Sequence, residues 1–383
     1  MGAPPGANFP EELMEVGVEK LKSLEEIQDD SPESQPHDHR KSRLSPTSAY
    51  ILRRIGLFLI TLWGSLTASF FFFRLLPGDP IRAYVGQLQQ RGNITTFTTD
   101  EEMVEHYQRE FGLDGSLINQ YVNYFRRLFL EFDLGPSVLS YPTPATELIA
   151  RALPWTVGLI GVATILGWLI GVLLGTVIAW NREKAWAEVV TNGALGFSHL
   201  PAYFVALFLI IFFAYRWRLL PSSGAFDTSM NPEWSLDFIA SVIRYGTLPV
   251  LATVIVAVAN WMLSTRALVV SILGEDYLTF AGAKGLTIRR ILTAYVLRNA
   301  WLPQIAALGM ALGGVVSGNV LIERLFRYPG VGNLLIDSVL IKDVNTAMAV
   351  VMMLIVLVLT INLLIDLMLP LIDPRVKLTG TGG

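Results

Sequence analysis

Six long stretches with almost no charged residues dominate this sequence. They span residues 55–73, 155–180, 194–215, 247–265, 300–322 and 346–365. Each has at least the roughly 20 residues that an α-helix needs to cross a hydrocarbon layer. Only 16% of the 383 residues are charged, whereas soluble proteins have about 25%. Because backbone polar groups in lipid must be bonded within their own segment, the sequence predicts an all-α polytopic membrane protein with six transmembrane helices.

The flanks of these stretches indicate how the chain crosses the membrane. Lys and Arg are more frequent in the flanks that lie inside if the N-terminus is cytoplasmic. Positive flanks favour the cytoplasm, so both termini are expected there. The first 50 residues are polar and do not resemble a signal peptide. We divide the chain into an acidic cytoplasmic extension (1–50), a first transmembrane helix (51–74), an extracytoplasmic lobe (75–153), a transmembrane core (154–370) with a cytoplasmic loop (266–299), and a cytoplasmic tail (371–383).

Two segments outside the membrane have helical patterns of their own. In the extension, apolar residues recur at roughly helical spacing, which fits either a disordered tail or an amphipathic helix that docks on a partner. In the lobe, Thr99 followed by Glu102 predicts a capped helix that ends near Gly112. A second helix with one apolar face is expected over 117–132, and a third starts at Thr143-Pro144. This helical lobe is either a packed lid or a docking surface.

The loop between the fourth and fifth stretches has the pattern of two short helices. Acidic residues precede the first helix and Lys284 closes it, as the helix dipole favours. Gly285 fits the left-handed residue that ends a helix, and Thr287 is placed to cap the next one. One face of the first helix then carries Tyr277, Phe280, Ala281 and Lys284. The residues alone fit a helix that docks on another protein or an ordinary connector.

Polar residues inside the apolar stretches are costly in lipid, so they are candidates for a transport pathway. These candidates are Asn260, Ser264, Gln304, Ser317 and Asn319. The alternative is that each bonds a neighbouring helix without touching a substrate. Glu323 and Arg324 follow the fifth stretch and are expected at the outer mouth of the pathway or in contact with an external protein.

The remaining features concern packing and excluded chemistry. Glycines on part of one face of the second stretch predict close helix packing; they are Gly161, Gly167, Gly171 and Gly175.

The four histidines are not clustered at ligand spacing and cysteine is absent, so no metal site is expected. No Gly-x-x-x-x-Gly-Lys-Ser/Thr loop is present, so ATP hydrolysis by this chain is not expected. Charges stop at the edges of the stretches, which argues against a stand-alone secondary transporter or a membrane-embedded enzyme.

Short motifs at defined places relative to the six stretches carry a family resemblance. In the loop they are Asp276-Tyr277-Leu278 and Ala281-Gly282-Ala283-Lys284-Gly285-Leu286. Elsewhere they are Leu75-Leu76-Pro77-Gly78-Asp79-Pro80, Gly112-Leu113-Asp114, Gln120-Tyr121, Asp133-Leu134-Gly135, Leu220-Pro221-Ser222-Ser223-Gly224, Glu323-Arg324-Leu325-Phe326, Pro329-Gly330-Val331-Gly332 and Asp373-Pro374-Arg375. Over about residues 50–377 the chain resembles an ABC importer permease of the dipeptide/oligopeptide/nickel family, although Thr279 replaces the Glu that opens the general coupling signature.

The resemblance implies the transmembrane domain of a type I ABC importer. It also implies a second homologous permease, two cytoplasmic ATPase subunits and an extracytoplasmic binding protein in a prokaryotic inner membrane. ATP and Mg would be bound by the ATPases, and this chain would hold no cofactor. The implied cargo is a di- or oligopeptide, with an oligosaccharide or nickel as alternatives. The residues implied to couple ATPase closure to alternating access are Asp276, Tyr277, Phe280, Ala281, Ala283, Lys284, Gly285 and Leu286.

Overall fold

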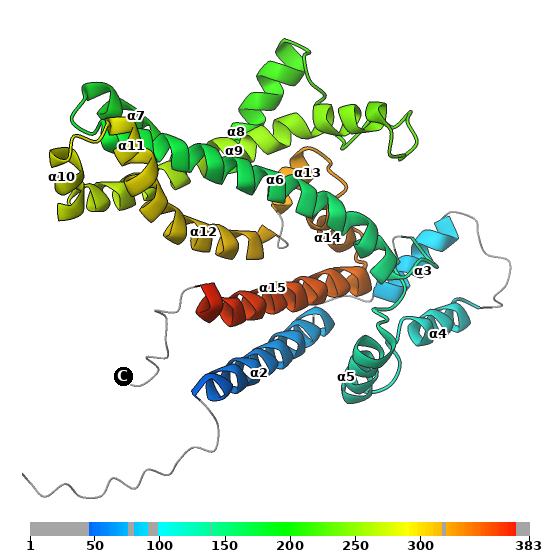
Figure 1. Ribbon diagram of the computed structural model, residues 1–383. Coiled ribbons are helices and arrows are strands. Elements are labelled where there is room, and N and C mark those ends of the chain that lie inside the picture. The colour runs from blue at the N-terminus through cyan, green and yellow to red at the C-terminus, as the bar shows by residue number, and fades with distance from the viewer. Residues whose placement is uncertain (1–45, 76–79, 91–98, 139, 316–318, 373–383) are drawn as a thin grey trace, which may run out of the picture. The chain divides into compact units, whose positions relative to one another are not determined.

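The computed structural model describes residues 46–75, 80–90, 99–138, 140–315 and 319–372, and every named element in these ranges is a helix (Figure 1). In chain order they are α2 (Pro46–Arg74), α3 (Pro80–Gln90), α4 (Asp100–Glu110), α5 (Leu117–Arg126), η1 (Arg127–Glu131), α6 (Ala145–Trp180), α7 (Ala185–Ser198), α8 (Ala202–Leu209), η2 (Ile210–Arg216), α9 (Leu236–Leu273), α10 (Asp276–Ala283), α11 (Ile288–Arg290), η3 (Ile291–Leu297), α12 (Arg298–Gly313), α13 (Val320–Leu325), α14 (Val331–Leu340) and α15 (Val344–Ile372). The three η elements are π-helical segments that continue an α-helix. Apart from the first residues of α2, all of them belong to one compact unit that begins at Tyr50. The predicted extension up to residue 45, and the tail from residue 373, lie outside the described residues.

The chain is a multi-pass α-helical membrane protein. Four of its described helices, α2, α6, α9 and α15, are long and apolar enough to cross a membrane. A fifth candidate is the pair formed by α7 and the α8–η2 helix, whose axes are bent by 99°. The predicted fifth stretch is not one helix, because α12 ends at Gly313 and α13 begins at Val320. The number of six spans therefore stays a prediction.

The third predicted stretch is also wrong as a continuous helix. It is interrupted between Ser198 and Ala202, where Pro201 occupies the N-cap of α8 with an extended backbone. Proline has no N–H to bond the preceding turn, and it disfavours helical geometry in the residue before it. A proline at this position therefore ends α7 and starts a new helix in another direction.

Two other prolines, Pro154 and Pro249, lie inside helices and do not end them. The predicted helix start at Thr143-Pro144 is confirmed, with Pro144 at the N-cap of α6. However, α6 continues for 36 residues through Pro154, so the third lobe helix and the second span are one helix. Likewise, α9 runs for 38 residues through Pro249. Each proline removes one backbone hydrogen bond, and the tertiary packing of a long helix can offset that loss. The boundary between lobe and core at residue 154 therefore falls inside one helix, and where α6 enters the membrane stays a prediction.

The two longest helices, α6 and α9, pack closely along the predicted glycine stripe. A Cβ atom on Gly167 would lie 2.6 Å from the Cβ of Ala257, and one on Gly175 would lie 2.6 Å from the carbonyl oxygen of Met262. Gly171 sits between them, against Trp261. Gly161 is outside this stripe, because its nearest atom beyond the helix is 4.0 Å away. Towards the lobe end, a buried cluster joins α6 and α9 to α8 and α13 through Leu159, Ala206, Leu248, Ala252, Ile322 and Phe326.

The first and last long helices lie side by side, so the two ends of the described chain meet (Figure 1). Leu66 and Phe70 of α2 are buried with Met348 and Met352 of α15. At the other end of the pair, Arg54 forms an ion pair of 2.9 Å with Asp366. This pairing places α2 against α15 although more than 250 residues separate the partners.

The lobe between α2 and α6 contains the helices α3, α4 and α5. The predicted N-cap is confirmed, because the hydroxyl of Thr99 accepts a hydrogen bond of 3.3 Å from the N–H of Glu102. The second predicted helix is confirmed as α5 and η1. Two buried bonds attach the lobe to the start of α15. Ser137 donates to the carboxylate of Asp343 at 2.7 Å, and Asn345 donates to the carbonyl oxygen of Phe111 at 3.3 Å.

Candidate functional site

The short helix α10 ends at Gly285, as the sequence predicts. Gly285 has a φ of +73°, in the left-handed region. Its N–H donates to the carbonyl oxygen of Gly282 at 2.9 Å, and the N–H of Leu286 donates to that of Ala281 at 3.3 Å. This pair of bonds is a Schellman motif, which satisfies the carbonyl groups at a helix end. Thr287 holds the N-cap position of α11, but its side chain makes no capping bond, so that part of the prediction is wrong.

One face of α10 is buried against the ends of the long helices. Leu278 is 8% exposed and Ala281 is 4% exposed. They form a buried cluster with residues of α6, α9, η3 and α12, namely Ala179, Val269, Ile291, Val296 and Ala300. Because Ala281 lies one turn after Leu278, it points into the chain. The expectation that Ala281 lies on an outward face with Tyr277 and Phe280 is therefore wrong.

The opposite face of α10 is open. Phe280 is 68% exposed, and the exposed residues Asp276, Gly282, Ala283 and Lys284 lie around it. No atom lies within 4 Å of where a Cβ on Gly282 would be. Tyr277 is oriented by Asn299, whose amide donates to its hydroxyl at 2.8 Å. Phe280 and the two small residues beside it therefore leave an open, partly apolar surface on this face of α10.

Gln304 is the buried member of the pathway candidates. Its side chain is 3% exposed, and the amide oxygen has no hydrogen-bond partner among the described residues. The backbone carbonyl of Gln304 accepts a bond of 3.2 Å from the indole of Trp168 on α6. Trp168 also meets Trp301 edge to face, with ring centroids 5.5 Å apart. Gln304 therefore lies between α12 and α6 with an unsatisfied acceptor, which costs free energy unless something else binds it.

The other pathway candidates do not gather around Gln304. Asn260 and Ser264 are exposed on the same side of α9, and Asn260 bonds its own helix at the carbonyl of Val256, 3.0 Å away. Asn319 caps α13 by accepting from the N–H of Ile322. Ser317 lies outside the described residues. The structure thus places Asn260 and Ser264 on an open face of α9. Asn319 has a local capping role, and Gln304 is buried.

Glu323 is buried, contrary to its predicted contact with an external protein. The side chain has no exposed surface. One carboxylate oxygen accepts from the hydroxyl of Thr156 at 2.9 Å, and the other accepts from the N–H groups of Gly332 at 2.7 Å and Asn333 at 3.2 Å. Burial raises the pKa of this carboxyl, while these bonds lower it. The carboxylate caps the N-terminus of α14, a position where negative charge is favourable.

The Pro329-Gly330-Val331-Gly332 motif makes room for this carboxylate. A Cβ on Gly330 would lie 2.6 Å from the hydroxyl oxygen of Thr156 and closer still to the carboxylate of Glu323. A Cβ on Gly332 would lie 2.8 Å from the Cα of Val320. The glycines are therefore required for close approach. The two motifs that follow the fifth stretch form one structural unit.

Arg324 is half-exposed and is paired within the chain. Its guanidinium donates to the amide oxygen of Asn333 at 3.1 Å and forms an ion pair with Asp337 of α14. About two-fifths of the Arg324 and Asp337 side chains remains accessible. Contact with an external protein is compatible with this geometry for Arg324, and it stays a prediction.

The fold defines the class of this protein: a polytopic α-helical membrane protein. Residues 171–378 match the family of binding-protein-dependent transport system inner membrane components. The dipeptide transport system permease protein DppB of Escherichia coli strain K12 is 30% identical over 345 residues, which covers 86% of this chain and 98% of that protein. The DppB of Lactococcus lactis subsp. cremoris and the oligopeptide transport system permease protein OppB of Salmonella typhimurium are each 28% identical, and each comparison covers 86% of this chain and 99% of the relative. The chain belongs to this family of ABC transporter permeases.

Proposed function

We propose that this chain is one permease subunit of an ABC importer that takes up di- or oligopeptides. Its relatives in three bacteria are named as permeases of dipeptide or oligopeptide transport systems, and their similarity extends over 86% of the chain. Oligosaccharide or nickel import by the same machinery is the alternative, because the resemblance in the short motifs does not select the cargo.

In the proposed complex, a second homologous permease supplies the other half of the pathway. Two ATPase subunits bind on the cytoplasmic side, where ATP and Mg are held, and a binding protein delivers peptide to the lobe side. Both termini of this chain lie in the cytoplasm of a prokaryotic cell, in agreement with the distribution of Lys and Arg. Asn260 and Ser264, which are exposed on α9, are proposed to face the pathway between the two permeases.

The observation that carries the proposal is the two-sided character of α10. Its buried face, with Leu278 and Ala281, is packed into the ends of α6, α9 and α12. Its open face presents Phe280. A movement imposed on the open face is therefore passed to three long helices through close-packed side chains, which transmit displacement instead of absorbing it. ATPase closure is coupled to alternating access by this route.

The test uses Gly282, because a large side chain there meets no atom of its own chain. Gly282→Trp is expected to fold and insert normally but to abolish peptide-stimulated ATP hydrolysis and peptide uptake in the reconstituted importer. Gly193→Trp is the matched control, since Gly193 is also an exposed helical glycine with open space around it. Uptake by Gly282→Trp at the rate of the unmodified importer would refute the coupling role of α10.

The cargo is tested with the same reconstituted importer and its own binding protein. Labelled dipeptides and longer peptides are expected to be accumulated in an ATP-dependent manner. Labelled oligosaccharide and Ni²⁺ are offered in parallel at the same concentration. Accumulation of either of these, in the absence of peptide uptake, would replace the peptide assignment and leave the importer class intact.

A further inference from the structure

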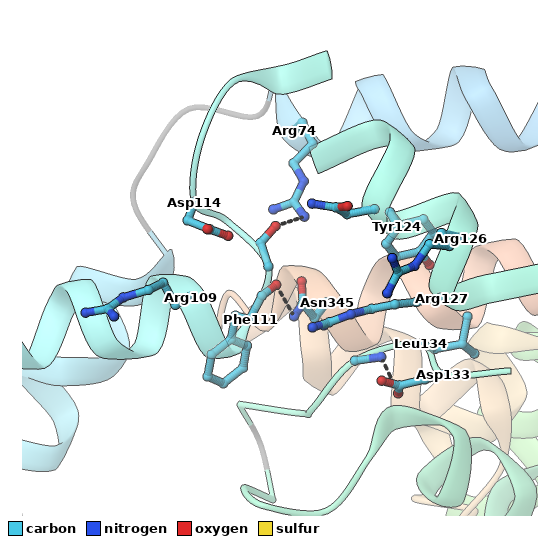
Figure 2. Close-up of a pocket in the computed structure, with 13 residues that line it drawn as sticks. Arg74, Arg109, Phe111, Asp114, Tyr124, Arg126, Arg127, Asp133, Leu134 and Asn345 are labelled. Atoms are coloured by element: carbon cyan, nitrogen blue, oxygen red, sulfur yellow. Dashed lines mark hydrogen bonds between the residues drawn. The ribbon is translucent and has the colours of Figure 1, made fainter. Parts of the chain in front are cut away.

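A positively charged cavity lies where the lobe meets the end of α2. Figure 2 shows it with its lining side chains, and its volume is about 220 Å³. The walls come from the last turn of α2, the α4–α5 connection, α5 with η1, and the first turn of α15. The charged lining residues are Arg74, Arg109, Arg126, Arg127, Asp114 and Asp133. With four arginines against two aspartates, the lining carries a net charge of +2 and favours an anion.

Arg74 is poorly satisfied by its own chain. Its Nε and Nη1 atoms are buried and have no hydrogen-bond partner among the described residues. Among the described residues the guanidinium makes one hydrogen bond, from Nη2 to the carbonyl oxygen of Gly112, and it is long, at 3.4 Å. Buried donors on a cation are costly when they are left without acceptors. An anion in the cavity would supply the missing acceptors.

Arg127 reaches the same cavity from another side. In Figure 2, Arg74 enters from α2, while the Arg127 side chain extends towards Asn345. The other two arginines contribute less, because Arg126 forms an ion pair of 3.3 Å with Glu131 and Arg109 bonds the carbonyl of Glu105. Arg74 and Arg127 line the cavity from different elements, and each guanidinium offers a planar fork of N–H donors. This geometry suits the oxygens of a phosphate.

The helix α5 lies beside the apolar part of α2, not beyond its end. The hydroxyl of Tyr121 is 2.9 Å from that of Thr67, and the ring of Tyr121 packs on Phe70. Thr67 lies two turns before Arg74, which is about 10 Å along the helix axis. Residues 50–74 form one of the candidate membrane spans. If α2 crosses the membrane, α5 is at the depth of the lipid headgroups and upper acyl chains.

One side of α5 and η1 is apolar and open. Ile118 is 74% exposed, Val122 is 56% exposed and Phe129 is 49% exposed. These residues recur at helical spacing on one face, about 100° around the helix from Tyr121, Tyr124 and Leu128, which pack on α2 and α15. An amphipathic helix with such a face lies in the membrane interface. Phe71 and Phe72 of α2 are also exposed, and the ring of Phe71 stacks on Tyr121 of α5.

We propose that this cavity binds the headgroup of an anionic phospholipid from the leaflet on the lobe side of the membrane. The phosphate lies between Arg74 and Arg127, and the acyl chains cover the face formed by Ile118, Val122 and Phe129. A lipid meets both requirements of the site, because it joins a negative charge to an apolar chain. An acidic side chain of a partner protein would meet only the first. The bound lipid fastens the lobe to the membrane span, independently of which cargo is imported.

The test measures lipid binding to the full-length chain in detergent by native mass spectrometry. The probes are dioleoylphosphatidylglycerol and dioleoylphosphatidylcholine, which share their acyl chains. We expect the phosphatidylglycerol to bind at least about tenfold more tightly, and we expect Arg74→Gln and Arg127→Gln each to weaken it about tenfold. A tenfold change corresponds to about 1.4 kcal/mol. Arg216→Gln is the matched control, because Arg216 is an exposed arginine at the end of another apolar helix.

Several outcomes would overturn the proposal. Equal affinity for the two lipids, or unchanged binding in both arginine variants, would show that the cavity is not a headgroup site. Inorganic phosphate that displaces phosphatidylglycerol at equal concentration would identify a site for the free anion. Variants that keep their lipid but capture the binding protein more weakly would assign the arginines to an acidic protein surface. If Arg74→Gln fails to fold, Arg127→Gln, whose side chain is only partly buried, decides the question alone.

Discussion

The hydroxyl of Thr156 on α6 donates a hydrogen bond of 2.9 Å to the carboxylate of Glu323 on α13. The same hydroxyl accepts a bond of 2.8 Å from the N–H of Val331, at the start of α14. All three groups are buried. This one contact therefore fixes two short helices to the long helix that runs from the lobe through the core. It also explains why an acidic residue follows an apolar stretch without facing water.

Replacing Glu323 with alanine is expected to lower the stability of the chain by about 3 kcal/mol. The change leaves the N–H groups of Gly332 and Asn333 without an acceptor, and unsatisfied buried groups cost about 1–3 kcal/mol each. The midpoint of thermal unfolding in detergent, followed by tryptophan fluorescence, measures the loss. Glu147→Ala is the control, because Glu147 forms an exposed i,i+4 ion pair with Arg151 that contributes little. Equal midpoints for the two variants would contradict the structural role of Glu323.

Gly330→Ala is expected to destabilise the same region by about 2 kcal/mol. The added methyl group would lie 2.6 Å from the hydroxyl of Thr156, so either the loop or the α6 side chain must move. Gly64→Ala in α2 serves as the comparison, because no atom lies within 4 Å of that position. Alanine is the better helix former, so Gly64→Ala is expected to raise stability by about 0.5–1 kcal/mol. The unfolding midpoints of the two variants should move in opposite directions.

The contact between α6 and α9 is expected to depend on Gly171 and not on Gly158, although both lie on α6. An alanine at position 171 would collide with Trp261 and would lie 3.0 Å from the carbonyl oxygen of Val258. Position 158 has open space around it. Gly171→Ala should lower the unfolding midpoint by several degrees, and it should also reduce the yield of folded chain in the membrane. Size-exclusion profiles that are identical for both variants, with equal midpoints, would mean that the helices do not approach so closely.

Asp343→Ala is expected to loosen the lobe. Asp343 accepts from Ser137 in the lobe at 2.7 Å, and it caps α15 by accepting from the N–H of Thr346 at 3.0 Å and from its hydroxyl at 2.6 Å. Loss of these bonds should cost about 3 kcal/mol, whereas Ser137→Ala, which removes only the bond to the lobe, should cost about 1 kcal/mol. Hydrogen exchange of the amides between residues 111 and 137 measures the effect. Asp227→Ala, at an exposed turn outside the lobe, should leave that exchange unchanged, and equal protection in all three variants would contradict the prediction.

Local features were predictable wherever nearby residues decide the structure. The capped start of α4 at Thr99 and the end of α10 at Gly285 each follow from a side chain or a φ angle that acts within one helical turn. The packing role of Gly167, Gly171 and Gly175 was also predictable, because small residues at helical spacing have few other uses in an apolar helix. The start of α4 and the end of α10 are each stabilised by groups within one helical turn.

Prolines and polar residues were harder to interpret, since the same residue type has different effects in different surroundings. Pro201 ends a helix, whereas Pro154 and Pro249 lie within helices. Ala281 points inward and Glu323 is sealed from water, although their sequence neighbours suggested exposed positions. For Glu323 the deciding contact comes from a residue far along the chain, Thr156.

The sequence by itself determined that this chain is an all-α membrane protein, because long uncharged stretches have few stable alternatives in water or lipid. Its short motifs indicated the permease family, and Gly285 indicated where α10 ends. Only the tertiary structure decided which face of α10 is open, which glycines admit a carboxylate, and that Arg74 and Arg127 line one cavity. Those properties depend on distances between residues that are remote in sequence. No local pattern specifies such distances, because they result from how the helices pack.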